Sequence, residues 1–357
     1  MSFFDRLKLW WHGKPAATQP AAGPIEGVQR GRVDHVIILD GTMSTLAQGQ
    51  EGNAGLLYQL LTEQGRKTDM TVYYEQGLQW EGWRHGMDIV LGRGINRQIR
   101  RAYGWLASHY REGDRIFLFG YSRGGYAVRS LAGVIDRVGL LKREHATERG
   151  VRLCYRHYQN NPESTSSRAF SRRFCHADAP VQMVGAWDTV KALGLRLPFF
   201  WMLGGQHDFH SHQLGRSIKH GFHALAINET RVAFAPVLWE CPKGCEITVE
   251  QVWFRGAHAD IGGNIGDFAA ARPLANIPLV WMLGRAETVG LSLPRGWQAR
   301  YPCDPMAPMV GTVRGFGLFF LLRRKRLIGL DPSESIHPSA AVPRGYRWRK
   351  WPLIRRL

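Results

Sequence analysis

The sequence has 357 residues, of which 44% are hydrophobic and 21% charged, as is usual for a globular protein large enough to bury a sizeable core. Lys and Arg number 47 against 29 Asp and Glu, and the formal net charge of +18 predicts an anionic partner: a nucleic acid, a membrane surface or an acidic substrate. Five cysteines argue against a disulfide framework, and no apolar run reaches the ~18 residues that span a bilayer.

Residues 1–30 are expected to lie outside the main domain. Aromatic, leucine and basic residues alternate at helical spacing over 2–12, which fits either a membrane interface or a helix that packs on its own domain. Residues 13–30 have the composition of a linker. No signal-peptide pattern is present, so we expect a cytoplasmic protein, soluble or peripheral on a membrane; export by a route that needs no signal peptide stays open.

Residues 31–346 are expected to form one α/β domain. Helical periodicity predicts helices over 97–110 and 126–138. Strands that alternate with helices favour a doubly wound, mostly parallel central sheet with helices on both faces. Short apolar runs predict its strands over 33–39, 71–75, 115–119, 181–187 and 251–254.

Two further segments have less regular patterns. Residues 192–240 predict either a cap over a site or part of the helical layer. Residues 347–357 form a basic, aromatic C-terminal tail.

The strongest chemical signal is the G-x-S-x-G pattern of Gly120, Ser122 and Gly124. It follows an apolar strand and precedes a helix, which is the strand-to-helix turn that exposes a nucleophilic serine. The glycines let backbone segments approach where a Cβ atom would clash. Ser122 is therefore the candidate nucleophile.

A serine hydroxyl needs a base, and the base needs an orienting acid. Asp188 directly follows a predicted strand, although it could instead cap a helix that begins at Thr189. His258 lies in a glycine-rich loop after the last predicted strand. The order Ser122, Asp188, His258 is the order expected for this kind of fold. Asp260 is too close to His258 to orient it and is expected to shape the loop.

An oxyanion hole needs two backbone N–H groups. We expect one from Arg123, the residue after the nucleophile, and the other from Gly41 or Thr42, which follow the first strand. Asp40 would hold that loop through hydrogen bonds to the backbone.

Metal or organic cofactors are not expected. Cys241 and Cys245 lack two further ligands at zinc-binding spacing. Five histidines form a second cluster along the chain: His207, His210, His212, His220 and His223. Their spacings match no common metal site, and a polar helix face is the preferred interpretation.

Several segments together resemble a known family. They are DGT (40–42), GRGINRQIRRAY (92–103), GYSRGGYAVRSLAG (120–133), GAWDTVKALG (185–194), HALAINETRVAFAPVLW (223–239), VWFRGAHADIGG (252–263) and IHPSAAVPRGY (336–346). In this order they resemble an α/β-hydrolase family long catalogued as a domain of unknown function, which includes the first class of type VI secretion lipase effectors. The similarity spans about residues 33–346.

The resemblance implies a phospholipase or related carboxylic ester hydrolase, with Ser122 as nucleophile, Asp188 as acid and His258 as base. The chain departs from the family at Met43 and Ser44, where Trp and Asn are common, and at Asn228, where Asp is frequent. These departures concern the oxyanion loop and substrate preference.

Two alternative functions stay open. One is a hydrolase of a soluble ester, thioester or amide. The other is a membrane-associated interaction protein with a vestigial hydrolase site. The sequence does not give the oligomeric state.

The segment 315–330 joins an apolar run to the basic residues 323–326. This pattern suits an anionic membrane surface, or a buried element with a solvated basic end. Tryptophans among the basic residues of the tail would also permit RNA binding, but no nucleic-acid motif supports it. The expected partners are thus a lipid or small-molecule ester substrate and an anionic membrane, and nucleic acid is not expected.

Overall fold

The structure is a computed structural model that describes residues 30–63, 65, 69–77, 93–190, 214–240, 247–312 and 322–340. Within these residues, seven parallel strands form one sheet in the order β2-β1-β3-β4-β5-β6-β7. The strands are β1 (Asp34–Leu39), β2 (Met70–Glu75), β3 (Arg115–Tyr121), β4 (Val181–Trp187), β5 (Ile218–Ala226), β6 (Thr248–Phe254) and β7 (Glu334–Ile336).

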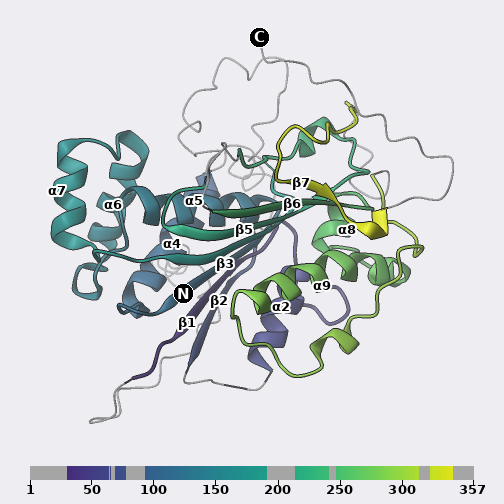
Figure 1. Cartoon of the computed structure of the whole chain (residues 1–357), viewed down its shortest axis with the longest axis horizontal. Helices are drawn as coiled ribbons and strands as arrows, with labels where there is room; N and C mark the ends of the chain where they lie inside the picture. The colour runs from purple at the N-terminus through teal and green to yellow at the C-terminus, as the bar shows by residue number, and fades with distance from the viewer. Residues whose placement is uncertain are drawn as a thin grey trace, which may run out of the picture.

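Helices cover both faces of the sheet, as Figure 1 shows. One layer consists of α4 (Arg93–His109) and α5 (Arg123–Arg137), with α6 (Glu148–Asn160) and α7 (Thr165–Phe174) beside them. The other consists of α2 (Asn53–Thr62), the short α8 (His258–Gly262) and α9 (Arg272–Thr288). Short 3-10 helices occur at Arg143–His145, Val232–Phe234, Ala269–Ala271, Trp297–Arg300 and Pro338–Ala340.

The side chains of β1 alternate between two hydrophobic cores. Ile37 and Leu39 belong to the core under α4 and α5, whereas Val36 and Ile38 belong to the core under α2 and α9. All four are fully buried. Successive side chains of a strand point to opposite faces, and burying each aliphatic side chain contributes about 1.5–3 kcal/mol. Burial on both faces therefore accounts for the continuous apolar run 36–39 of β1.

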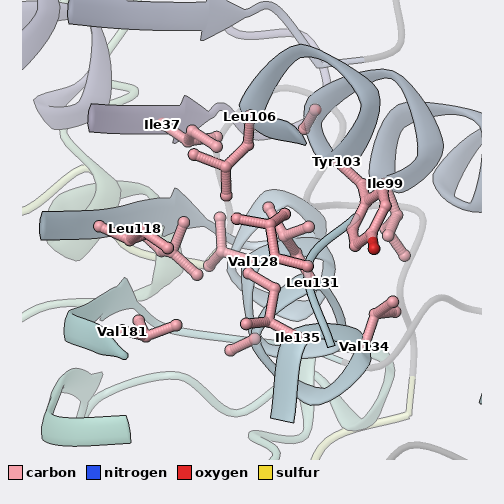
Figure 2. Packing of buried hydrophobic residues seen from close by; sticks show 14 of the residues in the cluster. Ile37, Ile99, Tyr103, Leu106, Leu118, Val128, Leu131, Val134, Ile135 and Val181 are labelled. Carbon is pink, nitrogen blue, oxygen red and sulfur yellow. The ribbon is translucent and has the colours of Figure 1, made fainter. Parts of the chain in front are cut away.

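The core under α4 and α5 fixes the helix that begins directly after Ser122. In Figure 2, Val128, Leu131 and Ile135 of α5 point toward Leu118 of β3 and Val181 of β4. These apolar residues recur at three- and four-residue spacing, which places them on one face of α5. The packing holds the start of α5 against the end of β3.

The predicted α/β fold, with a doubly wound and mostly parallel sheet, is confirmed. The five predicted strands correspond to β1, β2, β3, β4 and β6, and the two predicted helices correspond to α4 and α5. The structure thus has the arrangement of an α/β-hydrolase.

The prediction of a cap or a helical layer over residues 192–240 was wrong for residues 218–226. Residues 218–226 form β5, a central strand between β4 and β6, rather than part of a cap or a helix. Lys219, His220 and His223 hid the strand because they interrupt its apolar run. His220 and His223 therefore do not lie on a polar helix face. Residues 191–213, which include His207, His210 and His212, lie outside the described residues.

The parallel sheet brings the ends of three strands to one edge. Ser122 follows β3, Asp188 follows β4, and His258 begins α8 shortly after β6. The carboxyl ends of parallel strands share an edge of the sheet, where open α/β folds bind their ligands. Across the described ranges, no helix is long and apolar enough to cross a membrane.

Candidate active site

Ser122 occupies a strained turn between β3 and α5. Its backbone has φ 56° and ψ −119°, an uncommon conformation for a residue with a side chain. A Cβ on Gly120 would lie 2.4 Å from the carbonyl oxygen of Gly124, and a Cβ on Gly124 would lie 2.0 Å from that of Leu39. The two glycines of the motif are thus sterically required for this turn.

His258 and Ser122 are within hydrogen-bonding distance. The Nε2 atom of His258 lies 2.8 Å from the Oγ atom of Ser122. Both residues are buried, with exposed fractions of 5% and 7%, so the pair is shielded from most of the solvent. This geometry lets the imidazole accept the hydroxyl proton.

Asp188 completes the chain of hydrogen bonds. Its Oδ2 atom lies 2.6 Å from Nδ1 of His258, and its Oδ1 accepts a hydrogen bond of 2.9 Å from the N–H of Ala226. The carboxylate is fully buried, and the residue has a positive φ of 41°. With Nδ1–H donated to Asp188, Nε2 is the acceptor that faces Ser122.

Arg326, which no local sequence pattern indicated, contacts the same carboxylate. Its two terminal nitrogens lie 2.5 Å and 2.9 Å from Oδ1 and Oδ2 of Asp188. Burial alone would raise the pKa of the Asp188 carboxyl, but the charge of Arg326 and the hydrogen bond from His258 hold it well below its usual range. Asp188 is therefore ionised at neutral pH.

A second carboxylate fixes the backbone of His258. The N–H of His258 donates to Glu229 at 3.1 Å, and Arg231 forms a two-point ion pair with Glu229. The hydroxyl of Tyr121 donates to the carbonyl oxygen of His258 at 3.2 Å. The backbone of His258 is thus held on both sides by β3 and by the loop after β5.

The departure from the family at Asn228 has a structural explanation. The side-chain oxygen of Asn228 accepts a hydrogen bond of 2.8 Å from the N–H of Gly256, in the loop that leads to His258. An aspartate oxygen could accept the same bond. Asn228 therefore preserves the contact between the two loops.

Asp260 lies at the start of α8 and ties it to a distant segment. Its carboxylate accepts hydrogen bonds from the N–H groups of Ala257, Val310 and Gly311, at 2.8, 2.7 and 3.3 Å. These hydrogen bonds connect the start of α8 to residues 310 and 311.

The loop after β1 places constraints on the oxyanion hole. The N–H of Gly41 already donates to Oδ1 of Asp40 at 2.6 Å, and the other oxygen of Asp40 accepts a bond from Tyr74 at 2.7 Å. Of the two donors expected in this loop, the N–H of Gly41 is thus already engaged, which favours Thr42. Arg123 begins α5, and N–H groups at a helix N-terminus favour negative charge.

His223 contacts the backbone next to Asp188. It is fully buried on β5, and its Nε2 accepts a hydrogen bond of 3.0 Å from the N–H of Thr189, next to Asp188. Burial and the nearby charge of Arg129 lower the pKa of His223 to about 3, so this imidazole is neutral.

In the part of the chain that the structure describes, no group of three or more His, Cys, Asp or Glu side chains could hold a metal ion. Cys241 and Cys245 lie outside that part.

The model of the family described as "T6SS, Phospholipase effector Tle1-like, catalytic domain" matches residues 34–285. The chain belongs to this family. The predicted family is therefore confirmed, and the Tle1-like match covers the strands and loops that hold Ser122, Asp188 and His258. Arg326 lies beyond the matched residues.

Three other similarities accompany the Tle1-like match. The uncharacterized protein YEL023C of Saccharomyces cerevisiae is 25% identical over 225 residues, which are 56% of this chain and 31% of that protein. The Tle1 effector, solved bound to the VgrG spike of the type 6 secretion system, is 20% identical, with 70% of this chain and 56% of that chain covered and a TM-score of 0.38. The Est2 esterase of Thermogutta terrifontis is 14% identical, with 79% and 95% covered and a TM-score of 0.40. The chain thus spans about a third of the yeast protein and about half of the Tle1 chain.

Proposed function

We propose that this protein hydrolyses carboxylic esters, with Ser122 as nucleophile, His258 as general base and acid, and Asp188 as the acid that orients the imidazole. The observation that supports this most is the continuous chain of hydrogen bonds from Ser122 through His258 to Asp188. Membership of a family of phospholipase effector catalytic domains supports the same reaction class.

The proposed reaction has two stages. In the first, Oγ of Ser122 attacks the ester carbonyl carbon while its proton moves to Nε2 of His258. The imidazolium then protonates the departing alcohol oxygen as the C–O bond breaks, which leaves an acyl-serine. In the second stage, a water molecule gives a proton to His258 as its oxygen attacks the acyl carbon. His258 returns that proton to Ser122, and the carboxylic acid leaves.

Two backbone N–H groups would stabilise the oxyanion in both stages. Arg123 contributes one from the N-terminus of α5, where the helix dipole favours negative charge. Thr42 contributes the other from the loop after β1, since the N–H of Gly41 is used by Asp40. Such preorganised donors are usually a large part of catalysis in acyl transfer.

The substrate class that fits best is a phospholipid or other lipid acyl ester. Besides the family description, the surface close to the site supports it: Leu322, Leu327 and Leu330 are exposed beside Arg324 and Lys325. Apolar and basic side chains together suit an anionic bilayer interface. Membrane association at this surface is part of the proposal. The N-terminal amphipathic segment and the C-terminal tail lie outside the described residues.

Delivery outside the producing cell is part of the same proposal. The family is described as one of type VI secretion effectors, and such delivery would agree with the expected export without a signal peptide. A soluble ester, thioester or amide substrate is the alternative that a substrate panel distinguishes.

The test compares the intact chain with Ser122→Ala and with Ser166→Ala, which changes an exposed serine on α7. Each is treated with a fluorophosphonate probe and assayed on phospholipid vesicles and on a short-chain soluble ester. We expect labelling and hydrolysis by the wild type and by Ser166→Ala, and neither by Ser122→Ala. A faster rate on vesicles supports the lipid substrate, and a faster rate on the soluble ester favours the alternative. Wild type that binds vesicles without labelling or turnover would indicate a vestigial site.

A further inference from the structure

Residues 322–326, called the strap here, lie along the loop that follows β5. The N–H of Val232 donates to the carbonyl oxygen of Leu322 at 3.0 Å, and the N–H of Arg324 donates to that of Thr230 at 2.7 Å. Arg231 and Arg323 form an antiparallel bridge between the two segments. The strap is therefore held by backbone hydrogen bonds to the same loop that contains Glu229, the partner of His258.

The strap ends in an arginine that differs from its neighbours. Arg323, Arg324 and Lys325 are exposed, whereas the side chain of Arg326 has an exposed fraction of only 4%. Its guanidinium donates to both oxygens of Asp188, to the carbonyl oxygen of Ala226 at 2.9 Å and to that of Phe234 at 2.5 Å. Four acceptors thus fix its position.

We propose that Arg326 is a positioning residue of the triad: it fixes both oxygens of Asp188, and the C-terminal region beyond the family match thereby completes the active site. This inference rests on the proposed hydrolase function. Nothing in the family match, which ends at residue 285, assigns a role to this arginine.

The burial of Asp188 explains why such a partner is needed. An ionised carboxylate with no exposure loses its hydration, and a paired cation with further hydrogen bonds offsets that cost. Two parallel N–H donors from a planar guanidinium also fix the plane of a carboxylate, which an ammonium cannot do. With that plane fixed, Oδ2 stays aligned with Nδ1 of His258, and the imidazole stays aligned with Ser122.

Arg326 also affects how the acid and the base share protons. Asp188 and His258 are in direct contact. The positive charge of Arg326 holds the pKa of the Asp188 carboxyl down and opposes its protonation, so removal of that charge moves the acidic limb of kcat/KM to higher pH. The other charged or titratable groups around the pair remain unchanged in the test; they are Tyr121 on β3, Arg129 on α5, His223 on β5, and Glu229 and Arg231 in the loop after β5.

The test compares Arg326→Gln and Arg326→Lys with Arg115→Gln. Arg115 also makes a two-point contact with an aspartate, through Nε and one terminal nitrogen to Asp34 at 2.7 Å each, but at the opposite ends of the strands. The substrate is a short-chain soluble ester, so that membrane binding plays no part. We expect Arg326→Gln to lower kcat on the order of 100-fold with KM little changed. Its acidic limb should move up by about one pH unit or more.

Arg326→Lys should retain an acidic limb of kcat/KM close to that of the wild type, because the positive charge remains. Its kcat should fall, because an ammonium cannot supply the two parallel N–H donors of the guanidinium. Arg115→Gln should lower the melting temperature without moving the pH profile. If Arg326→Gln does not fold, Arg326→Lys still tests the positioning role. A kcat of Arg326→Lys equal to that of the wild type overturns the proposal.

A double-mutant cycle separates positioning from general stability. If Arg326 acts through Asp188, Arg326→Gln should have little further effect on kcat in the background of Asp188→Asn. Full additivity of the two losses overturns the proposal. A wild type that neither reacts with a fluorophosphonate probe nor hydrolyses the ester refutes the proposed function itself, whereas an active wild type with Arg326 variants that match Arg115→Gln refutes only the positioning role.

Discussion

Gly124 shows how one missing side chain makes the turn at Ser122 possible. A Cβ at this position would lie 2.0 Å from the carbonyl oxygen of Leu39, a backbone atom that cannot rotate away. At Gly284, inside α9, an added Cβ would meet no described atom within 4 Å other than those of its chain neighbours and the adjacent backbone of its own helix. A side chain is therefore sterically excluded at Gly124 but not at Gly284.

We expect Gly124→Ala to abolish hydrolysis and to lower the free energy of unfolding by a few kcal/mol, because β1 and the turn must separate. Gly284→Ala is the matched control, and it should raise the free energy of unfolding by up to about 1 kcal/mol with unchanged activity, since alanine favours helix. Denaturant unfolding and ester hydrolysis measure both. An active Gly124→Ala variant would contradict the geometry of this turn.

His223 predicts a pH dependence of stability. Its pKa is near 6.5 when unfolded and about 3 in the fold, so between these values the unfolded chain binds the extra proton. Stability therefore falls as pH drops below about 6.5, with a slope approaching 1.4 kcal/mol per pH unit from this residue. We expect His223→Gln to lower the free energy of unfolding at pH 7.5 but to flatten its decline toward pH 5. Denaturant titrations at both pH values test this, and an unchanged slope would contradict it.

At the level of elements, α8 depends on a contact that is distant in sequence. Asp260 accepts three backbone N–H bonds, two of them from residues 310 and 311. The short α8 has only five residues and begins with His258, so its position depends on such contacts more than on helix propensity.

Asp260→Asn should therefore cost about 1–3 kcal/mol of stability and reduce kcat, because an amide offers one acceptor atom and turns an N–H group toward another donor. Asp267→Asn, which changes an exposed carboxylate nearby, is the control and should behave as the wild type. Thermal unfolding and steady-state hydrolysis provide the two measurements. Equal kinetics for the two variants would rule out a role of Asp260 in holding α8.

Patterns along the chain predicted some elements and missed others for identifiable reasons. β1 and β3 were found because burial on both faces makes them continuous apolar runs. β5 was missed because His223 and Lys219 interrupt such a run, and β7 was missed because three residues are too few to form a pattern. Ser122, Asp188 and His258 follow strand ends, so local sequence indicated them. Arg326 becomes visible only when the strap lies beside the loop after β5, and no local pattern indicates that contact.

For the whole molecule, the excess of basic residues predicts binding to anionic vesicles. We expect the protein to sediment with vesicles that contain anionic phospholipid, less so as salt rises, and weakly with neutral vesicles. Arg324→Gln with Lys325→Gln should weaken this binding by about 2 kcal/mol, or about 30-fold, if these residues contact the bilayer. Arg156→Gln with Arg168→Gln removes the same charge from exposed positions on α6 and α7. Equal losses for both pairs would mean that net charge, and not this surface, determines binding.

The distance along the chain between the proposed triad and Arg326 has a consequence for synthesis. Ribosomes make a chain from its N-terminus, and domains can begin to fold before synthesis ends. Ser122, Asp188 and His258 are all translated well before Arg326 and before β7, which closes one edge of the sheet. If Arg326 positions Asp188 as proposed, a nascent chain that ends before residue 326 has Ser122, Asp188 and His258 but not the guanidinium that holds the carboxylate. Full hydrolytic activity would then arise only after residue 326 has been synthesised and the strap has joined the loop after β5.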